Sequence, residues 1–218
     1  MRRGTYECSR FRKAIVRNTF LHVTRHSSLV TCALAALSAV LPAFSHSACA
    51  LETEHVESTY VEKQFRCEVI ALLDAPASAV EAVLRDYESY PELDERILQA
   101  RVLARPTPTT AMLETKLRAC FGPFCRTVRR VEEVLESPQA LSAVTDPGRS
   151  DVRFGETHTS IEAIDADHTR VVYRTSIIPG FWVPALGGRR WMLETMEAAT
   201  LKLFRNIETR ARDRDEEG

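Results

Sequence analysis

The sequence lacks the short motifs that mark common classes of enzyme. Its 218 residues contain no glycine-rich phosphate loop, no H-E-x-x-H zinc pattern, no C-x-x-C pair and no G-x-S-x-G nucleophile turn. Internal repeats, low-complexity tracts and, after residue 60, Gly/Ser linkers are also missing. We therefore expect a single domain without a familiar catalytic set, and no bound cofactor or metal.

The chain as a whole also lacks an excess of charge of one sign, with 29 Lys and Arg against 30 Asp and Glu. Residues 1–50 hold seven of the basic residues and one acid, which leaves residues 51–218 with 22 basic and 29 acidic residues, a net charge of −7. A body this acidic argues against nucleic acid as the main partner. Apolar residues make up 44% and charged residues 27%, which excludes a disordered chain, a collagen-like repeat and a polytopic membrane protein.

The first fifty residues have the pattern of a secretory signal peptide. Basic residues up to Arg25 precede an uncharged apolar run over residues 28–44, and the small residues of Ala48-Cys49-Ala50 follow. This order predicts a signal peptide over residues 1–50, cleaved after Ala50, and export to the bacterial periplasm. An uncleaved membrane anchor is the alternative, because about 17 apolar residues are at the lower limit for spanning a bilayer.

Three of the six cysteines lie beyond this segment: Cys67, Cys120 and Cys125. Cys120 and Cys125 flank a Phe-Gly-Pro-Phe stretch that looks like a hairpin loop, so the two thiols can face each other at bridging distance. An oxidising compartment permits this disulfide. Cys67 lies in an alternating strand and is expected to be a buried, unreactive thiol.

The remaining chain predicts one α+β domain with strands first and a long helix last. Residues 65–73 alternate apolar and polar side chains, and a helix capped by Asp74 and a short helix from Glu92 to Arg96 follow. Further strands are expected at residues 97–104, 110–119, 126–136, 139–145, 151–164 and 171–177. Short turns between consecutive strands indicate an antiparallel sheet.

The long helix is expected from Arg189 to about Arg212. Its apolar stripe consists of Met192, Met196, Ala199, Leu203 and Ile207, while Glu208 is among the residues expected to face water. The predicted domain covers residues 60–212. Residues 51–59 are expected to be a short N-terminal segment, and residues 213–218 a charged tail that frays.

Three segments carry a resemblance to a known superfamily: D-A-P-A-S-A-V-E-A-V-L-R-D-Y-E-S-Y-P-E-L at residues 74–93, the strand at 97–103 and the helix at 191–207. They resemble the START-like (SRPBCC) superfamily, in its polyketide cyclase/dehydrase and coenzyme Q-binding branch. The resemblance implies a helix-grip fold, in which a curved antiparallel sheet of about six or seven strands wraps around a long C-terminal helix, with two short helices after the first strand. It also implies a cavity for a hydrophobic molecule between the sheet and that helix.

The candidate site residues fall in two regions. Four of them gather in and after the Pro- and Gly-rich loop at residues 178–188: Phe181, Trp182, Trp191 and Met192. They form either a mobile lid that touches ligand or membrane, with Arg189 and Arg190 near lipid headgroups, or a plug at the end of the core. The resemblance places the other candidates at the rim of the cavity: Tyr87, Tyr90 and Leu93.

One strand carries polar residues that admit two interpretations. His158, Glu156 and Glu162 lie on the same side of it and form either a proton relay or weak metal site, or a polar strip on the outer face of the sheet. The pairs Arg129-Arg130 and Glu132/Glu133 are expected to be solvated surface charges.

Three function classes remain open. The first, which the missing catalytic set favours, is a non-enzymatic binding or transfer protein for a lipid, quinone or polyketide-like compound, with transient membrane contact. The second is a cyclase- or dehydratase-type enzyme that uses the same cavity. The third is a module that binds another envelope protein through the apolar loop.

Overall fold

The computed structural model describes residues 51–121, 124–184 and 186–217, so the predicted signal segment lies outside the described residues. The described residues contain an eight-stranded antiparallel sheet in the order β1-β2-β8-β7-β6-β5-β4-β3. The strands are β1 (Glu52–Val61), β2 (Gln64–Leu73), β3 (Ile97–Thr107), β4 (Thr110–Phe121), β5 (Phe124–Ser137), β6 (Ala140–Thr145), β7 (Val152–Ala163) and β8 (Thr169–Pro179). The helices are α1 (Ala77–Arg85), the 3-10 turn η1 (Tyr87–Ser89), α2 (Tyr90–Leu93) and α3 (Gly188–Glu217).

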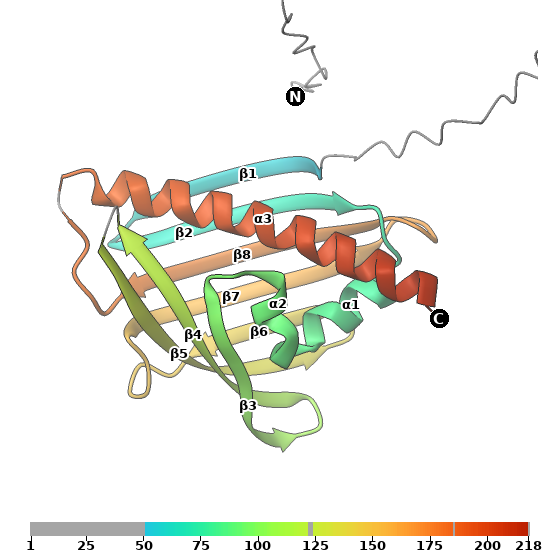
Figure 1. The fold of residues 1–218 in the computed structure, drawn as a ribbon, viewed down its shortest axis with the longest axis horizontal. Coiled ribbons are helices and arrows are strands. Elements are labelled where there is room, and N and C mark those ends of the chain that lie inside the picture. Colours follow the sequence, from blue (N-terminus) through green and yellow to red (C-terminus); the bar gives the residue numbers. More distant parts are fainter. Residues whose placement is uncertain (1–50, 122–123, 185, 218) are drawn as a thin grey trace, which may run out of the picture. The chain divides into compact units, whose positions relative to one another are not determined.

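The curved sheet wraps around α3, and α1 and α2 lie beside the C-terminal part of that helix (Figure 1). The predicted α+β helix-grip fold is therefore confirmed. On β2 the inward side chains at positions 65, 67, 69, 71 and 73 are at most 3% exposed, as the alternating pattern requires. Phe204 and Ile207 of α3 pack against the same buried cluster, so the core lies between the sheet and the helix.

The sheet contains one strand more than the sequence predicted, because residues 52–61 form β1. This edge strand pairs with β2 from Glu52↔Leu72 to Val61↔Gln64, and most of its side chains stay exposed. An exposed edge strand needs no apolar alternation, so its sequence carries no strand signal. The turn to β2 is made by Glu62 and Lys63, both with positive φ, instead of the Asn-Gly or Asp-Gly pair that marks such turns.

The short helices also differ in detail from the prediction. Asp74 does not cap α1; Pro76 occupies the cap position and no side chain bonds to the free N–H groups. The second short helix spans Tyr90–Leu93 and follows a 3-10 turn, because Pro91 fits the first turn of a helix, where its missing N–H is not needed.

The last helix continues to Glu217, beyond the predicted end near Arg212, so residues 213–217 are helical. Arg210 pairs with Glu92 at 2.8 Å and Arg214 pairs with Asp86, which ties this end of α3 to the short helices. Glu208, which was expected to face water, is 4% exposed. No helix among the described residues is both long and apolar enough to cross a membrane.

Candidate functional site

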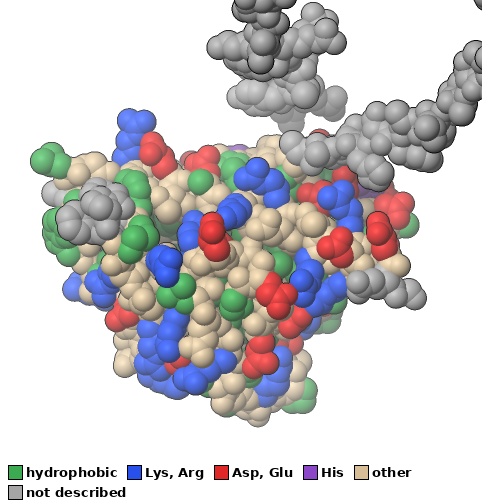
Figure 2. Space-filling model, viewed as in Figure 1, with side chains coloured by type: hydrophobic (Ala, Val, Ile, Leu, Met, Phe, Trp, Pro, Cys, Tyr) green, Lys and Arg blue, Asp and Glu red, His purple; other side chains and the backbone are tan. Residues whose placement is uncertain are grey.

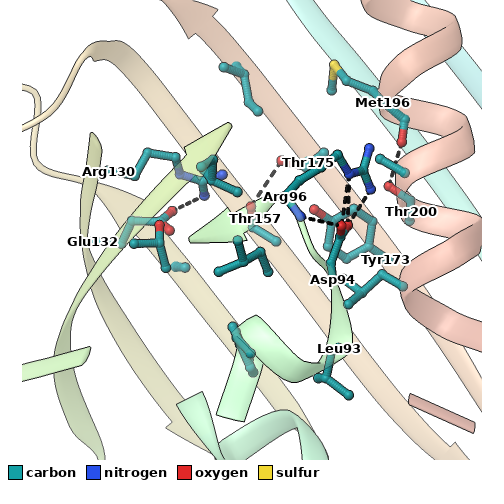
Figure 3. Close-up of a pocket in the computed structure, with 18 of the residues that line it drawn as sticks. Leu93, Asp94, Arg96, Arg130, Glu132, Thr157, Tyr173, Thr175, Met196 and Thr200 are labelled. Atoms are coloured by element: carbon teal, nitrogen blue, oxygen red, sulfur yellow. Dashed lines mark hydrogen bonds and ion pairs between the residues drawn. The ribbon is translucent and has the colours of Figure 1, made fainter. Parts of the chain in front are cut away.

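A cavity of about 510 Å³ lies between the inner face of the sheet and α3. Side chains from β3 to β8 form its wall on one side, and the predicted apolar stripe of α3 faces it from the other: Met192, Met196, Ala199, Leu203 and Ile207. Figure 3 shows side chains from β5, β7, β8 and α3 converging on this space. The fold thus leaves open part of the volume that a core would fill.

The sequence-predicted site residues line both ends of this space. Tyr87, Tyr90 and Leu93 line the cavity at the short helices. Phe181, Trp191 and Met192 line its opposite end and also a second pocket of about 260 Å³. Trp182 lines only that second pocket. These residues form the wall of the candidate binding site, while their contact with a ligand stays a prediction.

The two tyrosines turn their hydroxyl groups toward the protein. The Tyr87 hydroxyl donates to Glu136 at 2.8 Å, and the Tyr90 hydroxyl donates to the Leu84 carbonyl at 2.6 Å. Their rings make an edge-to-face contact with centroids 5.7 Å apart. Burial raises the pKa of both hydroxyls, so both stay neutral at physiological pH. Their rings consequently present apolar surface to the cavity.

Glu136 fixes the position of Tyr87. This carboxylate is 9% exposed and accepts hydrogen bonds from Arg85 at 2.9 Å and Arg105 at 3.0 Å as well as from Tyr87. Burial alone would raise the pKa of Glu136, but the bonds from Tyr87, Arg105 and Arg85 outweigh burial and lower it. The carboxylate therefore stays ionised and holds η1 against β3 and β5.

The second pocket adjoins the cavity where β8 passes into α3. The two share Ala119, Cys120, Phe181, Trp191 and Met192 among their lining residues. Cys120 and Cys125 lie directly opposite each other in the β4–β5 register and form the predicted disulfide, at the rim of this pocket. The second pocket is therefore the mouth of the cavity.

The loop at the mouth exposes large apolar side chains. Trp182 is 80% exposed and Leu186 is 93% exposed, so Trp182 does not plug the core. Phe181 is half-buried beneath the Arg126 guanidinium, whose central carbon is 4.9 Å from the ring centroid. Figure 2 shows hydrophobic side chains gathered at the end of the molecule where α3 begins, at the left of the view.

A buried ion pair inside the cavity was missed by the sequence analysis. Arg130 on β5 donates from Nη2 to Glu132, and Glu132 is 5% exposed (Figure 3). Burial opposes the charge on Arg130, but Glu132 outweighs burial and raises the pKa of the guanidinium. Strand parity could have revealed the pair, because Arg130 and Glu132 alternate in phase with the buried Val128 and Val134.

Hydroxyl groups extend this polar region across β7 and β8. The Thr157 and Thr175 hydroxyls lie 3.0 Å apart, and the Thr175 hydroxyl donates to the Glu156 carbonyl at 3.2 Å. Burial raises the pKa of Tyr173, although Arg130 opposes that rise, so this hydroxyl remains protonated. We call the set that lines the middle of the cavity the polar belt: Arg130, Glu132, Thr157, Thr159, Tyr173 and Thr175.

A second ion pair lines the wall near the short helices and serves to hold α2 in place. Asp94 accepts bonds from the Arg96 backbone N–H at 3.0 Å and from Nε at 2.9 Å. Burial would raise the pKa of Asp94, but the bonds from Arg96 outweigh burial and lower it. Asn206 of α3 donates to the Leu93 carbonyl at 2.6 Å, which joins α2 to the long helix.

The outer strip of polar residues is solvated. His158 is exposed and its Nδ1 lies 2.9 Å from the Ser142 hydroxyl, while Glu156 and Glu162 are exposed beside it. Within the described ranges no three His, Cys, Asp or Glu side chains gather as metal ligands would. The polar-strip interpretation of this strand therefore holds.

Comparison with known proteins shows the fold but not the ligand. No family model and no curated protein matches the chain. A STAR-related lipid transfer protein from Xanthomonas axonopodis is 15% identical with a TM-score of 0.58, over 75% of this chain and 99% of that one. The Zhui aromatase/cyclase from a Streptomyces species is 13% identical with a TM-score of 0.56, over 69% and 95%. A Mycobacterium smegmatis START superfamily protein is 17% identical with a TM-score of 0.54, over 66% and 97%.

Proposed function

Because the chain has the START-like helix-grip fold, we propose that it binds and carries a hydrophobic small molecule such as a lipid, a quinone or a polyketide-like compound. The observation that carries this proposal is the cavity of about 510 Å³ between the sheet and α3. Small-molecule sites typically measure about 300–1,000 Å³. Removal of apolar surface from water, at roughly 25 cal/mol per Å², drives binding without a cofactor. The names of the lipid transfer protein and the aromatase/cyclase support an apolar occupant.

In this proposal the ligand is exchanged by transient contact with an anionic membrane surface. Trp182 and Leu186 project at the mouth, where they can enter the lipid headgroup region. Arg126 and Arg189 stack on the rings of Phe181 and Tyr60, and no carboxylate in the described part of the chain pairs with either. Two unpaired cations beside exposed apolar side chains fit an anionic bilayer.

We further propose that the carrier works outside the cytoplasm. The predicted signal peptide over residues 1–50 is the main reason, with the bacterial periplasm as the expected compartment and an uncleaved membrane anchor as the alternative. The Cys120–Cys125 disulfide supports export, because structural disulfides persist in oxidising compartments.

Mass spectrometry of organic extracts tests the carrier function. The protein is purified from the exported fraction of its own host without detergent, and the extract is compared with that of a control protein purified in parallel. We expect one class of apolar compound in stoichiometric amount. Purified protein that holds no such compound and takes none up from vesicles of host lipid contradicts the proposal.

A cyclase- or dehydratase-type enzyme is the second candidate. It is favoured by the Glu132 carboxyl group inside the cavity, which could move a proton at a bound molecule beside the positive charge of Arg130. An enzyme would convert the extracted compound to a product of altered mass, such as one that has lost water, whereas a carrier would release it unchanged. A module that only binds protein partners is less well supported, because its interior would be filled by side chains.

A further inference from the structure

The polar belt lies between two apolar stretches of the cavity. At the end near the short helices the cavity is lined by Leu84 and Leu93, and on β8 Ile177 lines it beyond Thr175, toward the mouth. On β5, Val134 follows Arg130 and Glu132 at the end near the short helices. A ligand that fills the cavity therefore meets polar groups near its middle and apolar groups at both ends.

The belt holds hydrogen-bonding groups that the protein does not satisfy. Within the described residues, the guanidinium of Arg130 makes one hydrogen bond, from Nη2 to Glu132, which leaves other N–H groups of this cavity-lining side chain without an acceptor. Thr159, a residue 6% exposed, places a further hydroxyl group on the wall of the cavity. An oxygen atom of a ligand in the cavity can accept hydrogen bonds from these groups.

The charges in the belt cancel. Arg130 is neutralised by Glu132, and Asp94 pairs with Arg96 on the same wall. Arg118 also lines the cavity and forms no ion pair within the described residues, so this neutrality holds for the belt and not for the whole wall. A carboxylate or phosphate would bring a further charge next to Glu132 in an apolar space, where its desolvation is not compensated. A carbonyl or hydroxyl oxygen requires only a hydrogen-bond donor.

On the basis of the proposed carrier function, we infer that the polar belt selects an uncharged ligand with a carbonyl or hydroxyl oxygen in the middle of an apolar skeleton. Arg130 and Thr159 donate to that oxygen, and the apolar side chains on either side of the belt enclose the two ends. The arrangement discriminates against plain hydrocarbons, which leave the donors unpaired, and against an anionic group placed at the belt, where it would lie next to Glu132.

The test compares three probes of equal chain length: undecan-6-one, undecane and undecanoate. Delipidated full-length protein is equilibrated with each probe, and the bound amount is measured by gas chromatography after extraction. The variant Arg130→Met with Glu132→Leu removes the whole ion pair; exchange of a buried pair for apolar residues of similar volume usually preserves folding. The control variant Arg174→Met with Glu68→Leu removes a similar pair, 2.8 Å long, from the outer face of the sheet.

We expect wild-type protein to bind undecan-6-one at least tenfold more tightly than undecane, a difference of 1.4 kcal/mol. The inner variant should lose this preference and retain undecane binding, and the outer variant should behave as wild type. An unchanged preference in the inner variant overturns the inference, as does undecanoate binding that is tightest and depends on Arg130. If wild-type protein binds neither undecane nor undecan-6-one, the carrier function fails and the inference fails with it.

Discussion

Replacement of Trp182 by alanine tests whether the loop between β8 and α3 contacts a membrane or serves only to stabilise the fold. A buried aromatic side chain removes about 150–250 Å² from water. Trp182 is 80% exposed, so roughly 200 Å² remains available for insertion into a membrane, worth at most about 5 kcal/mol. Because a side chain at the headgroup level is only partly dehydrated, we expect Trp182→Ala to weaken vesicle binding by at least tenfold, about 1.4 kcal/mol.

The same exposure predicts that folding stability hardly changes, within about 0.5 kcal/mol, or less than about 2 °C in Tm. Sedimentation with anionic and neutral vesicles measures binding, and calorimetry measures Tm. Ile164→Ala is the matched control, because Ile164 is 51% exposed in the turn between β7 and β8, at the opposite end of β8. Vesicle binding of Trp182→Ala equal to that of wild type, or a large fall in its Tm, refutes the reasoning.

Three further changes test other parts of the structure. Ala199→Phe places a ring in the cavity from α3, so the extracted ligand should fall by more than half while Tm stays equal or rises, because the added ring fills apolar space. Burial raises the pKa of Glu208 above its value in the unfolded chain, so the folded protein is most stable while this side chain is protonated and loses that stability as pH rises through the folded pKa. Glu208→Gln should therefore raise Tm at pH 7 and leave Tm unchanged near about pH 4, as measured by thermal scans in matched buffers. Thiol counting on unreduced protein without residues 1–50 should find only Cys67 free, and two additional free thiols would contradict the disulfide. The double variant Cys120→Ser with Cys125→Ser should lower the free energy of unfolding by about 2 kcal/mol in a urea titration.

The sequence predicted those elements whose local pattern coincides with their burial. The inward positions of β2 alternate strictly, and the apolar stripe of α3 from Met192 to Ile207 lines the cavity as its helical spacing required. The Cys120–Cys125 disulfide could be predicted equally well, because a short hairpin brings its two ends together through local geometry alone. The resemblance to START-like proteins added the cavity itself, together with the rim residues Tyr87 and Tyr90.

Elements that depend on contacts distant in sequence escaped prediction. β1 shows no alternation, because it is an exposed edge strand held mainly by backbone pairing with β2. Residues 213–217 have a composition typical of a frayed end, yet Arg214 pairs with Asp86, 128 positions earlier in the chain, and α3 continues. Glu208 lies four residues after Phe204, and only the packing of α1 and β2 against α3 reveals that this side chain is buried.

The sequence by itself determined the spacing of apolar side chains along the strands and helices that it predicted, and therefore which of their side chains share a face. It did not determine how far apart the two apolar faces come to lie, because that distance depends on the curvature of the sheet and on the position at which α3 crosses it. Tertiary structure alone decided that the space remains open and that Trp182 projects from its mouth. Strand parity places Arg130 and Glu132 on the inner face of β5, but only the open apolar space beside them gives their hydrogen-bonding groups the capacity to select a ligand.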